Sequence, residues 1–255
     1  MIYDAANLST PLRIKADLCV VGSGAGGAAA AMAAAEAGLR VIVLEAGPFL
    51  TPAQMSQREE DMLARLYWDA AARTTADRAV RIHQGRGVGG STLHNLNLCK
   101  RIPKPVLEQW QRERGLQHLP LARWQALYEE TERLLSVSSV SADKRNRHNQ
   151  LVAAGASELG WRHGGLRHNR TGCTESGFCE IGCAYDAKNN AAKVLIPRAV
   201  DAGATVLAHC HALRVDHDGS RVRGVHALAM SADGQVRGTI HVDAPKVCLS
   251  ASATS

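Results

Sequence analysis

The chain has 255 residues, 45% of them hydrophobic and 21% charged, which is the composition of a soluble globular protein with a buried core. Its net charge of +6 comes from scattered lysines and arginines without interleaved aromatic residues, so nucleic-acid binding is not predicted. No segment approaches the roughly 18 apolar residues of a membrane helix, and residues 1–15 show no export signal. Seven cysteines, an odd number, argue against a secreted disulfide framework, so we expect a cytoplasmic protein.

The first elements are predicted from apolar runs and small residues. Residues 16–21 form an apolar run that ends at Gly22, which indicates a buried strand. Residues 24–38 are rich in alanine and glycine and predict a helix, and residues 40–44 predict a second buried strand. Together they form a βαβ unit with a parallel sheet. Helical patches are expected around residues 56–72.

The middle of the chain carries apolar residues at helical spacing, which predicts a helical insertion at about residues 104–170. Its helices are expected over residues 106–114, 121–135 and 149–159.

The last part of the chain predicts a helix over residues 189–202, with Pro197 interrupting its pattern. Strand-like runs then alternate with Asp-Gly turns, which indicates an antiparallel β-meander at about residues 204–243. Its strands are expected over residues 205–216, 221–230 and 236–243, and a last buried strand over residues 246–250.

The junction between the first strand and the first helix carries the pattern G-x-G-x-x-G. Its residues are Gly22, Ser23, Gly24, Ala25, Gly26 and Gly27. The first glycine permits a tight turn, the second lets the backbone approach a pyrophosphate, and the third lets the helix pack against the strand. Glu45 ends the second strand, where a carboxylate can accept hydrogen bonds from a ribose diol. The motif alone leaves a simple tight turn open, as well as the choice between NAD and FAD.

A second glycine-rich segment, residues 85–95, reads Gly-Arg-Gly-Val-Gly-Gly-Ser-Thr-Leu-His-Asn. It resembles the flavin segment of the glucose–methanol–choline (GMC) oxidoreductases. Consecutive glycines leave backbone amides bare beside a second part of a cofactor, and Ser91 and Thr92 are good helix-capping residues. We therefore expect this loop and the first glycine loop to converge on one extended FAD. The alternative is an NAD-dependent reductase, in which the glycine-rich residues 85–95 would have no role in cofactor binding.

The resemblance extends over almost the whole chain, including residues 183–188 and the helix that ends near Ala199. It implies an α/β, doubly wound, Rossmann-like FAD-binding domain over residues 1–255, with the C-terminal substrate domain missing. By resemblance, Ala212 contacts the adenine through its backbone, and Ser252 stands where the family pattern has glycine. The further cofactor-binding residues implied are Ala46, Gly85, Arg86, Gly89, Gly90, Ser91, His94, Asn95, Leu96, Asn97 and Ala251.

His94 has two interpretations. In some members of the family a histidine at this place is joined covalently to the flavin, which would raise the flavin potential. The alternative is that His94 lies beside the flavin ring without a covalent bond, or that it only hydrogen-bonds to residues that contact the ring.

Cys173, Cys179 and Cys183 form the pattern C-x5-C-x3-C. The spacing is similar to that in family dehydrogenases with an iron–sulfur cluster, and three thiolates would suffice for a 3Fe–4S cluster. The alternative is that they are small buried residues that pack a loop. His209, Cys210 and His211 alternate along a strand, so their side chains point to opposite faces and we expect a structural role.

The family's reaction is oxidation of a CH–OH group of an alcohol or sugar with hydride transfer to flavin N5. Its catalytic histidine follows the meander, so we expect the chain to end before that residue and leave the catalytic residues unassigned. A separate polypeptide completing the enzyme, or an electron-acceptor protein, is then an expected partner. The alternatives are a flavin-binding remnant without turnover and a fragment of an iron–sulfur-bearing dehydrogenase subunit.

Overall fold

The computed structural model describes residues 1–253, which form two compact units. One unit comprises Met1–Leu96 and the chain from Thr174 onward, and the other comprises Asn97–Cys173. Among residues 1–253, no helix is both long enough and apolar enough to pass through a bilayer.

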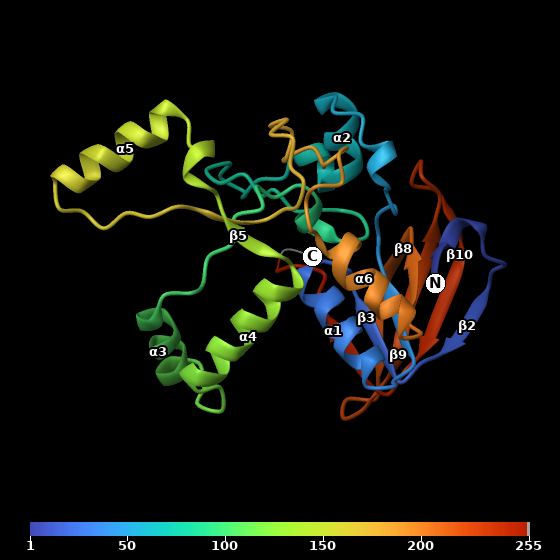
Figure 1. The fold of residues 1–255 in the computed structure, drawn as a ribbon. Coiled ribbons are helices and arrows are strands. Elements are labelled where there is room, and N and C mark those ends of the chain that lie inside the picture. The colour runs from blue at the N-terminus through green and yellow to red at the C-terminus, as the bar shows by residue number, and fades with distance from the viewer. Residues whose placement is uncertain (254–255) are drawn as a thin grey trace. The chain divides into compact units, whose positions relative to one another are not determined.

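The first unit is built on a five-stranded parallel sheet (Figure 1). The strands, in spatial order, are β1 (Ile2–Asp4), β7 (Thr205–Ala208), β4 (Val41–Leu44), β3 (Leu18–Val21) and β11 (Val247–Leu249). Helices α1 (Ala25–Glu36) and α6 (Ala191–Asp201) lie side by side, and α1 packs on β3 and β4. A Cβ on Gly27 would overlap the Gly22 carbonyl oxygen, so α1 approaches its strand as closely as the sequence predicts.

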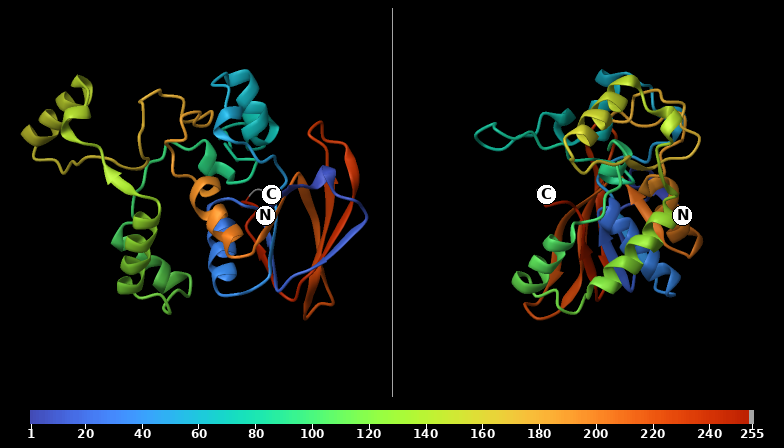
Figure 2. Two further views of the ribbon diagram at one scale, coloured as in Figure 1. Left: turned by 45° about the vertical axis from the view of Figure 1, so that its right-hand side comes forward. Right: turned by 60° about the vertical axis from the view of Figure 1, so that its left-hand side comes forward.

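A four-stranded sheet covers the other face of the parallel sheet (Figure 2). Its order is β2 (Leu12–Lys15), β10 (Val236–Asp243), β9 (Val222–Met230) and β8 (Cys210–His217). The antiparallel strands β8, β9 and β10 are the predicted meander, and β2 adds to β10 in parallel. The core between the sheets contains Cys19, Val21, Ile42, Leu44, Leu207, Val225, Ala227, Ala229, Ile240 and Val242.

The single strand predicted over residues 205–216 is wrong. The strand is interrupted at His209, whose φ of +51° lies outside the extended region. As a result, β7 belongs to the parallel sheet and β8 to the antiparallel strands of the other sheet. Both halves have the residue pattern of a strand, and periodicity alone does not show at which residue the chain passes from one sheet to another. Strands β1 and β2 lie in the segment for which no strand was predicted.

The segment after β4 contains α2 (Glu59–Leu66), which is shorter than the predicted helical patch. A second apolar cluster in this unit is formed by Leu50, Met55, Met62, Leu66, Tyr67, Leu93 and Ile181. It joins the segment after β4 to the end of the second glycine-rich loop.

The unit Asn97–Cys173 contains the three predicted helices as α3 (Lys104–Glu113), α4 (Leu121–Leu134) and α5 (Arg147–Glu158). Strands β5 (Val137–Ser139) and β6 (Arg167–Asn169) form an antiparallel pair. Glu132 on α4 accepts hydrogen bonds from Arg101 and from Arg167 at 2.7–2.8 Å. The Arg101 guanidinium lowers the pKa of Glu132 to about 2, so the Glu132 carboxylate stays charged at neutral pH.

Candidate functional site: a pocket between two glycine-rich loops

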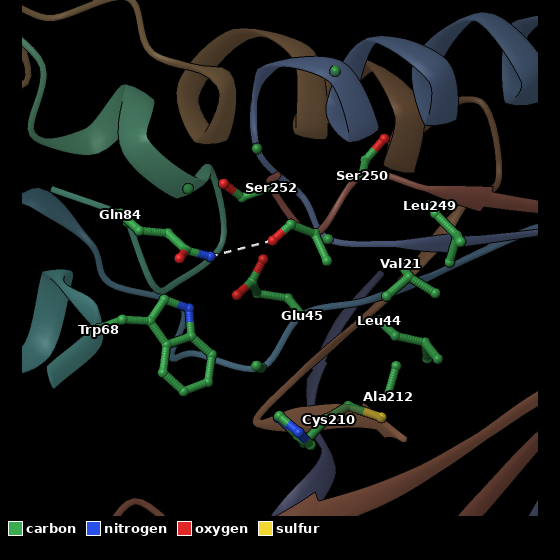
Figure 3. A pocket seen from close by; sticks show the side chains of 18 of the residues that line it. Val21, Leu44, Glu45, Trp68, Gln84, Cys210, Ala212, Leu249, Ser250 and Ser252 are labelled. Atoms are coloured by element: carbon green, nitrogen blue, oxygen red, sulfur yellow. Dashed lines mark hydrogen bonds between the residues drawn. The ribbon is translucent and has the colours of Figure 1, made fainter. Parts of the chain in front are cut away.

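The first unit contains a pocket of about 730 Å³ at the carboxyl ends of β3, β4 and β11. This edge of a parallel sheet is where α/β proteins bind nucleotides. Figure 3 shows the Trp68 indole on one side of the pocket and Val21, Leu44 and Leu249 on the other, with Glu45 between them. Both glycine-rich loops contribute to the lining, so the two loops lie together at one pocket. That they bind one extended FAD stays a prediction.

The two loops meet backbone to backbone at Gly24 and Gly90. A Cβ on Gly90 would lie 2.7 Å from the Gly24 Cα, a distance that side chains do not tolerate. Gly90 also has a φ of +55°, which L-residues rarely adopt. Glycine at position 90 is therefore required both by the contact and by the backbone conformation.

Glu45, a residue that is only 7% exposed, joins the loops through its carboxylate. One oxygen accepts hydrogen bonds from the Ser23 amide at 3.0 Å and the Ser23 hydroxyl at 2.7 Å. The other accepts from the amides of Gly47 at 3.0 Å and Gly87 at 3.2 Å. Ser23 continues the network, because its hydroxyl accepts from the Gly89 amide at 3.1 Å. Glu45 therefore holds the loops together, a role that the sequence did not reveal.

The predicted cofactor-binding residues divide into two sets. Those that line the pocket are Gly22, Gly24, Gly26, Glu45, Ala46, Gly85, Gly90, Ser91, Ala212 and Ala251. Those outside its lining are Ser23, Gly27, Arg86, Gly89, His94, Asn95, Leu96 and Asn97, and the last of these belongs to the other unit. Ser23 and Gly89 do not line the pocket, but their hydrogen bonds hold the two loops in place.

Three residues that the sequence analysis missed complete one wall of the pocket. Arg73 donates a 2.6 Å hydrogen bond to Gln84, and Gln84 donates one of 3.2 Å to the Ala251 carbonyl (Figure 3). The Arg73 guanidinium also lies 5.3 Å from the centre of the Trp68 ring. The only available signal was the position of Gln84 directly before Gly85. Trp68 and Arg73 carried none, because tertiary folding brings them to the pocket.

Ser252, at the rim of this pocket, has a φ of +84° in the left-handed region. The resemblance implies glycine at this position, which would adopt this conformation more easily than serine. We expect Ser252→Gly to raise the free energy of unfolding by about 1 kcal/mol and Tm by about 2–4 °C. Thermal unfolding checks this, with Ser220→Gly in an exposed turn of negative φ as the control. An unchanged or lower Tm in Ser252→Gly would contradict the argument.

His94 is 5% exposed and stacks on Tyr67 with ring centroids 3.8 Å apart. Its Nε2 atom is buried without a hydrogen-bond partner. Burial, assisted by the nearby Lys188 charge, lowers the pKa of His94 to about 4, so the ring is neutral at pH 7. The side chain faces the second apolar cluster. Whether it joins the flavin covalently stays a prediction.

The lowered pKa of His94 makes stability depend on pH. Between pH 6.5 and 4 the unfolded chain holds a proton on this ring that the folded chain does not, so stability falls as pH falls through that range. His94→Gln should remove up to about 3 kcal/mol of this loss. Urea unfolding at pH 7 and pH 4.5 measures it, with the exposed His148→Gln as the control. The same pH dependence in His94→Gln would refute the assignment.

Lys188 is 2% exposed and lies beneath the end of the second glycine-rich loop. Its ammonium donates hydrogen bonds to the carbonyls of Leu93 at 3.0 Å, Asn95 at 2.5 Å and Cys179 at 2.8 Å. Burial lowers the pKa of Lys188 to about 8. A lysine carries three donors, so all of them are used, and residues 93–95 are fastened to the cysteine-containing loop.

The predicted 3Fe–4S cluster finds no support in the structure. Cys173 belongs to one unit, and Cys179 and Cys183 belong to the other. Within either unit, the residues described here bring no three cysteine sulfurs within 4.8 Å of one another. The Cys183 sulfur instead accepts a hydrogen bond from the Ala187 amide at 3.3 Å, as expected of a cysteine that packs a loop.

Comparison with known proteins gives two family matches. Residues 63–255 match the family described as GMC oxidoreductase, and residues 20–81 match the NAD(P)-binding Rossmann-like domain. The uncharacterized GMC-type oxidoreductase MT0511/MT0512 of Mycobacterium tuberculosis (strain CDC 1551 / Oshkosh) is 35% identical over 247 residues, which cover 96% of this chain and 38% of the relative. Long-chain-alcohol oxidase FAO3 of Arabidopsis thaliana is 28% identical, over 94% of this chain and 33% of its own length.

Among solved structures, pyridoxine 4-oxidase from Mesorbium loti superposes with a TM-score of 0.66 at 19% identity, which shows a shared fold. The alignment covers 93% of this chain and 49% of that one. The chain thus spans between a third and a half of the length of these three proteins. The family match covers most of the chain, and the fold and the two glycine-rich loops agree with it, so the chain belongs to the GMC oxidoreductase family.

Proposed function

We propose that this chain binds FAD in the pocket between its two glycine-rich loops and serves an oxidoreductase that acts on the CH–OH group of an alcohol. The observation that carries the proposal is the contact of Gly24 with Gly90 inside one continuous pocket. The pocket volume of about 730 Å³ lies in the range of cofactor sites. An FAD bound here would supply a two-electron acceptor for the alcohol hydride.

The amino end of α1 suits a pyrophosphate. Gly24, Ala25 and Gly26 line the pocket, the N-cap Gly24 provides no side-chain hydrogen bond, and the first turn contains no acidic residue. The free amides and the positive end of the helix dipole are therefore available to an anion. The absence of side chains at Gly24 and Gly26 lets the phosphates approach the backbone.

The other residues that line the pocket would lie beside different parts of the bound cofactor. Ala212 on β8 and the turn Ser250–Ser252 would border the nucleotide end, beside Glu45. Gly85, Gly90 and Ser91 would border the part that leads toward the flavin ring. We assign no catalytic base to a residue of this chain.

The alcohol donor is supported by what one similar protein is named for, a long-chain alcohol. We propose that the whole protein oxidises a primary or secondary alcohol. Reduction of the bound flavin by candidate alcohols under anaerobic conditions tests this step separately from cofactor binding. A chain that binds FAD but transfers no hydride from any alcohol would support a flavin-binding remnant.

Gly24 offers the sharpest test of FAD binding. A Cβ at Gly24 would have the Gly90 Cα as its nearest neighbour at 4.0 Å, which is ordinary van der Waals contact, so Gly24→Ala should fold normally. The added methyl group would instead occupy the space of the pyrophosphate. We expect FAD affinity, measured by quenching of flavin fluorescence, to fall at least about tenfold in Gly24→Ala, or about 1.4 kcal/mol.

Gly155→Ala is the matched control, because a Cβ at Gly155 on α5 meets no atom within 4 Å. Thermal unfolding of both variants separates loss of binding from loss of fold. Unchanged FAD affinity in Gly24→Ala, or tighter binding of NAD than of FAD by the unmodified chain, would overturn the proposed site.

A further inference from the structure

The outer face of the four-stranded sheet carries a pair of histidines that the FAD site does not use. His226 on β9 lies directly opposite His241 on β10 in the antiparallel register. Their rings pack edge to face with centroids 4.2 Å apart, and their Nδ1 atoms face each other at 3.3 Å. Two ring nitrogens at this distance need a proton or a metal ion between them.

Each histidine directs its other ring nitrogen toward a carboxylate. The Nε2 atom of His241 lies 3.2 Å from Asp243, and the Nε2 atom of His226 lies 3.6 Å from Asp216. A carboxylate at Nε2 holds the ring proton there and leaves the Nδ1 lone pair free, which is how proteins orient histidine ligands of metals. Both free lone pairs therefore point into the same gap.

The spacing of the two Nδ1 atoms fits a metal. A tetrahedral ion with metal–nitrogen bonds of roughly 2.0–2.1 Å holds neighbouring ligand nitrogens about 3.3–3.4 Å apart. The observed separation of 3.3 Å equals that edge. Asp216 belongs to the same group, because one ligand atom each of Asp216, His226 and His241 lies within 4.8 Å of the other two. Its carboxylate lies on the Nε2 side of His226, as that of Asp243 does for His241, so it positions the ring.

The surrounding charges indicate which metal would bind. Arg13 forms a bidentate pair with Asp243 at 2.6 Å, and Arg214 lies 4.0 Å from Asp216. The two guanidinium groups balance the carboxylates, so a hard cation such as Mg²⁺ would gain little electrostatic attraction. The neutral imidazoles select a borderline transition metal instead.

We propose that the Nδ1 atoms of His226 and His241 form a surface site for a divalent transition metal, Zn²⁺ being the representative ion, with Asp216 positioning His226 and Asp243 positioning His241. The bound ion would link β9 to β10 on the face of this sheet opposite the core. This inference does not depend on the proposed function, and its test requires no flavin.

The test is calorimetric titration of the purified 255-residue chain with Zn²⁺, and with Mg²⁺ for comparison. We expect saturable binding of one Zn²⁺ without comparable Mg²⁺ binding, together with a rise in Tm. Affinity should fall at least tenfold in His226→Ala and His241→Ala and 10- to 100-fold in Asp243→Asn. His148→Ala, an exposed histidine on α5, should leave it unchanged.

Co²⁺ distinguishes the site from the cysteines of the chain, because thiolate ligands add an intense near-ultraviolet charge-transfer band that nitrogen and oxygen ligands lack. Co²⁺ binding without this band supports the histidine site. The proposal fails if the band is present, or if His226→Ala and His241→Ala bind Zn²⁺ as tightly as the unmodified chain. It also fails if millimolar Zn²⁺ does not bind, since a shared proton would then occupy the gap. The metal-free Tm of each variant shows whether the fold is retained.

Discussion

Replacing Lys188 with methionine is expected to reduce the free energy of unfolding by about 3–5 kcal/mol, the range reached when a buried charged group loses its hydrogen-bond network. Methionine has a similar length but no donor, so the carbonyls of Leu93, Asn95 and Cys179 would lose the ammonium that they share. Urea unfolding at pH 7 measures this loss. Lys193→Met is the matched control, because Lys193 also lies near the start of α6 but its side chain is partly exposed.

The same substitution should change alkaline stability in a defined direction. Burial holds the pKa of Lys188 at about 8, below its ordinary value of 10.5. Between pH 8 and 10.5 the unfolded chain binds a proton that the folded chain lacks, so this group makes stability rise with pH in that range. Lys188→Met should remove the rise. A stability loss in Lys193→Met as large as in Lys188→Met, or an unchanged alkaline profile, would contradict the role of Lys188.

Replacing Glu45 with glutamine is the second large effect. The two side chains have nearly the same shape, but an amide nitrogen cannot accept hydrogen bonds. Whichever way the amide is oriented, two donors among Ser23, Gly47 and Gly87 lose their acceptor in a buried site. We expect a loss of about 2–4 kcal/mol in unfolding free energy, together with weaker FAD binding because the two loops are no longer held together.

Glu36→Gln is the control for Glu45→Gln. Glu36 on α1 pairs with Arg198, but both side chains are partly exposed, so the expected loss is at most about 1 kcal/mol. Unfolding in urea and flavin-fluorescence quenching are measured on both variants. If Glu45→Gln retains full stability and full FAD affinity, the four hydrogen bonds do not hold the loops and Glu45 has only a local role.

Much of the pocket lining could be predicted because its constraints are local. The pattern from Gly22 to Gly27 requires a tight turn followed by a closely packed helix, and residues 85–95 require bare backbone. The family resemblance then joined these two loops to one cofactor. The three helices of the insertion were also visible, since a periodic apolar stripe is a property of a single segment.

Residues that act across long sequence separations could not be predicted. Trp68, Arg73 and Gln84 line the pocket only because their segment folds back against the turn after β11. The role of Lys188 depends on three carbonyls that are up to 95 positions away along the chain. The contacts of Lys188 leave no pattern in the sequence, because the acceptors are backbone atoms that every residue carries.

The sequence by itself determined the α/β class, the position of the dinucleotide turn and the second glycine-rich loop, since each depends on neighbouring residues and on backbone conformations that only glycine adopts easily. The tertiary structure alone decided that residues 205–217 divide between two sheets at His209 and that Glu45 fastens the two loops. It also decided that His226 and His241 face each other across β9 and β10. These features arise from strand register and from burial, which depend on the whole fold and not on any single segment.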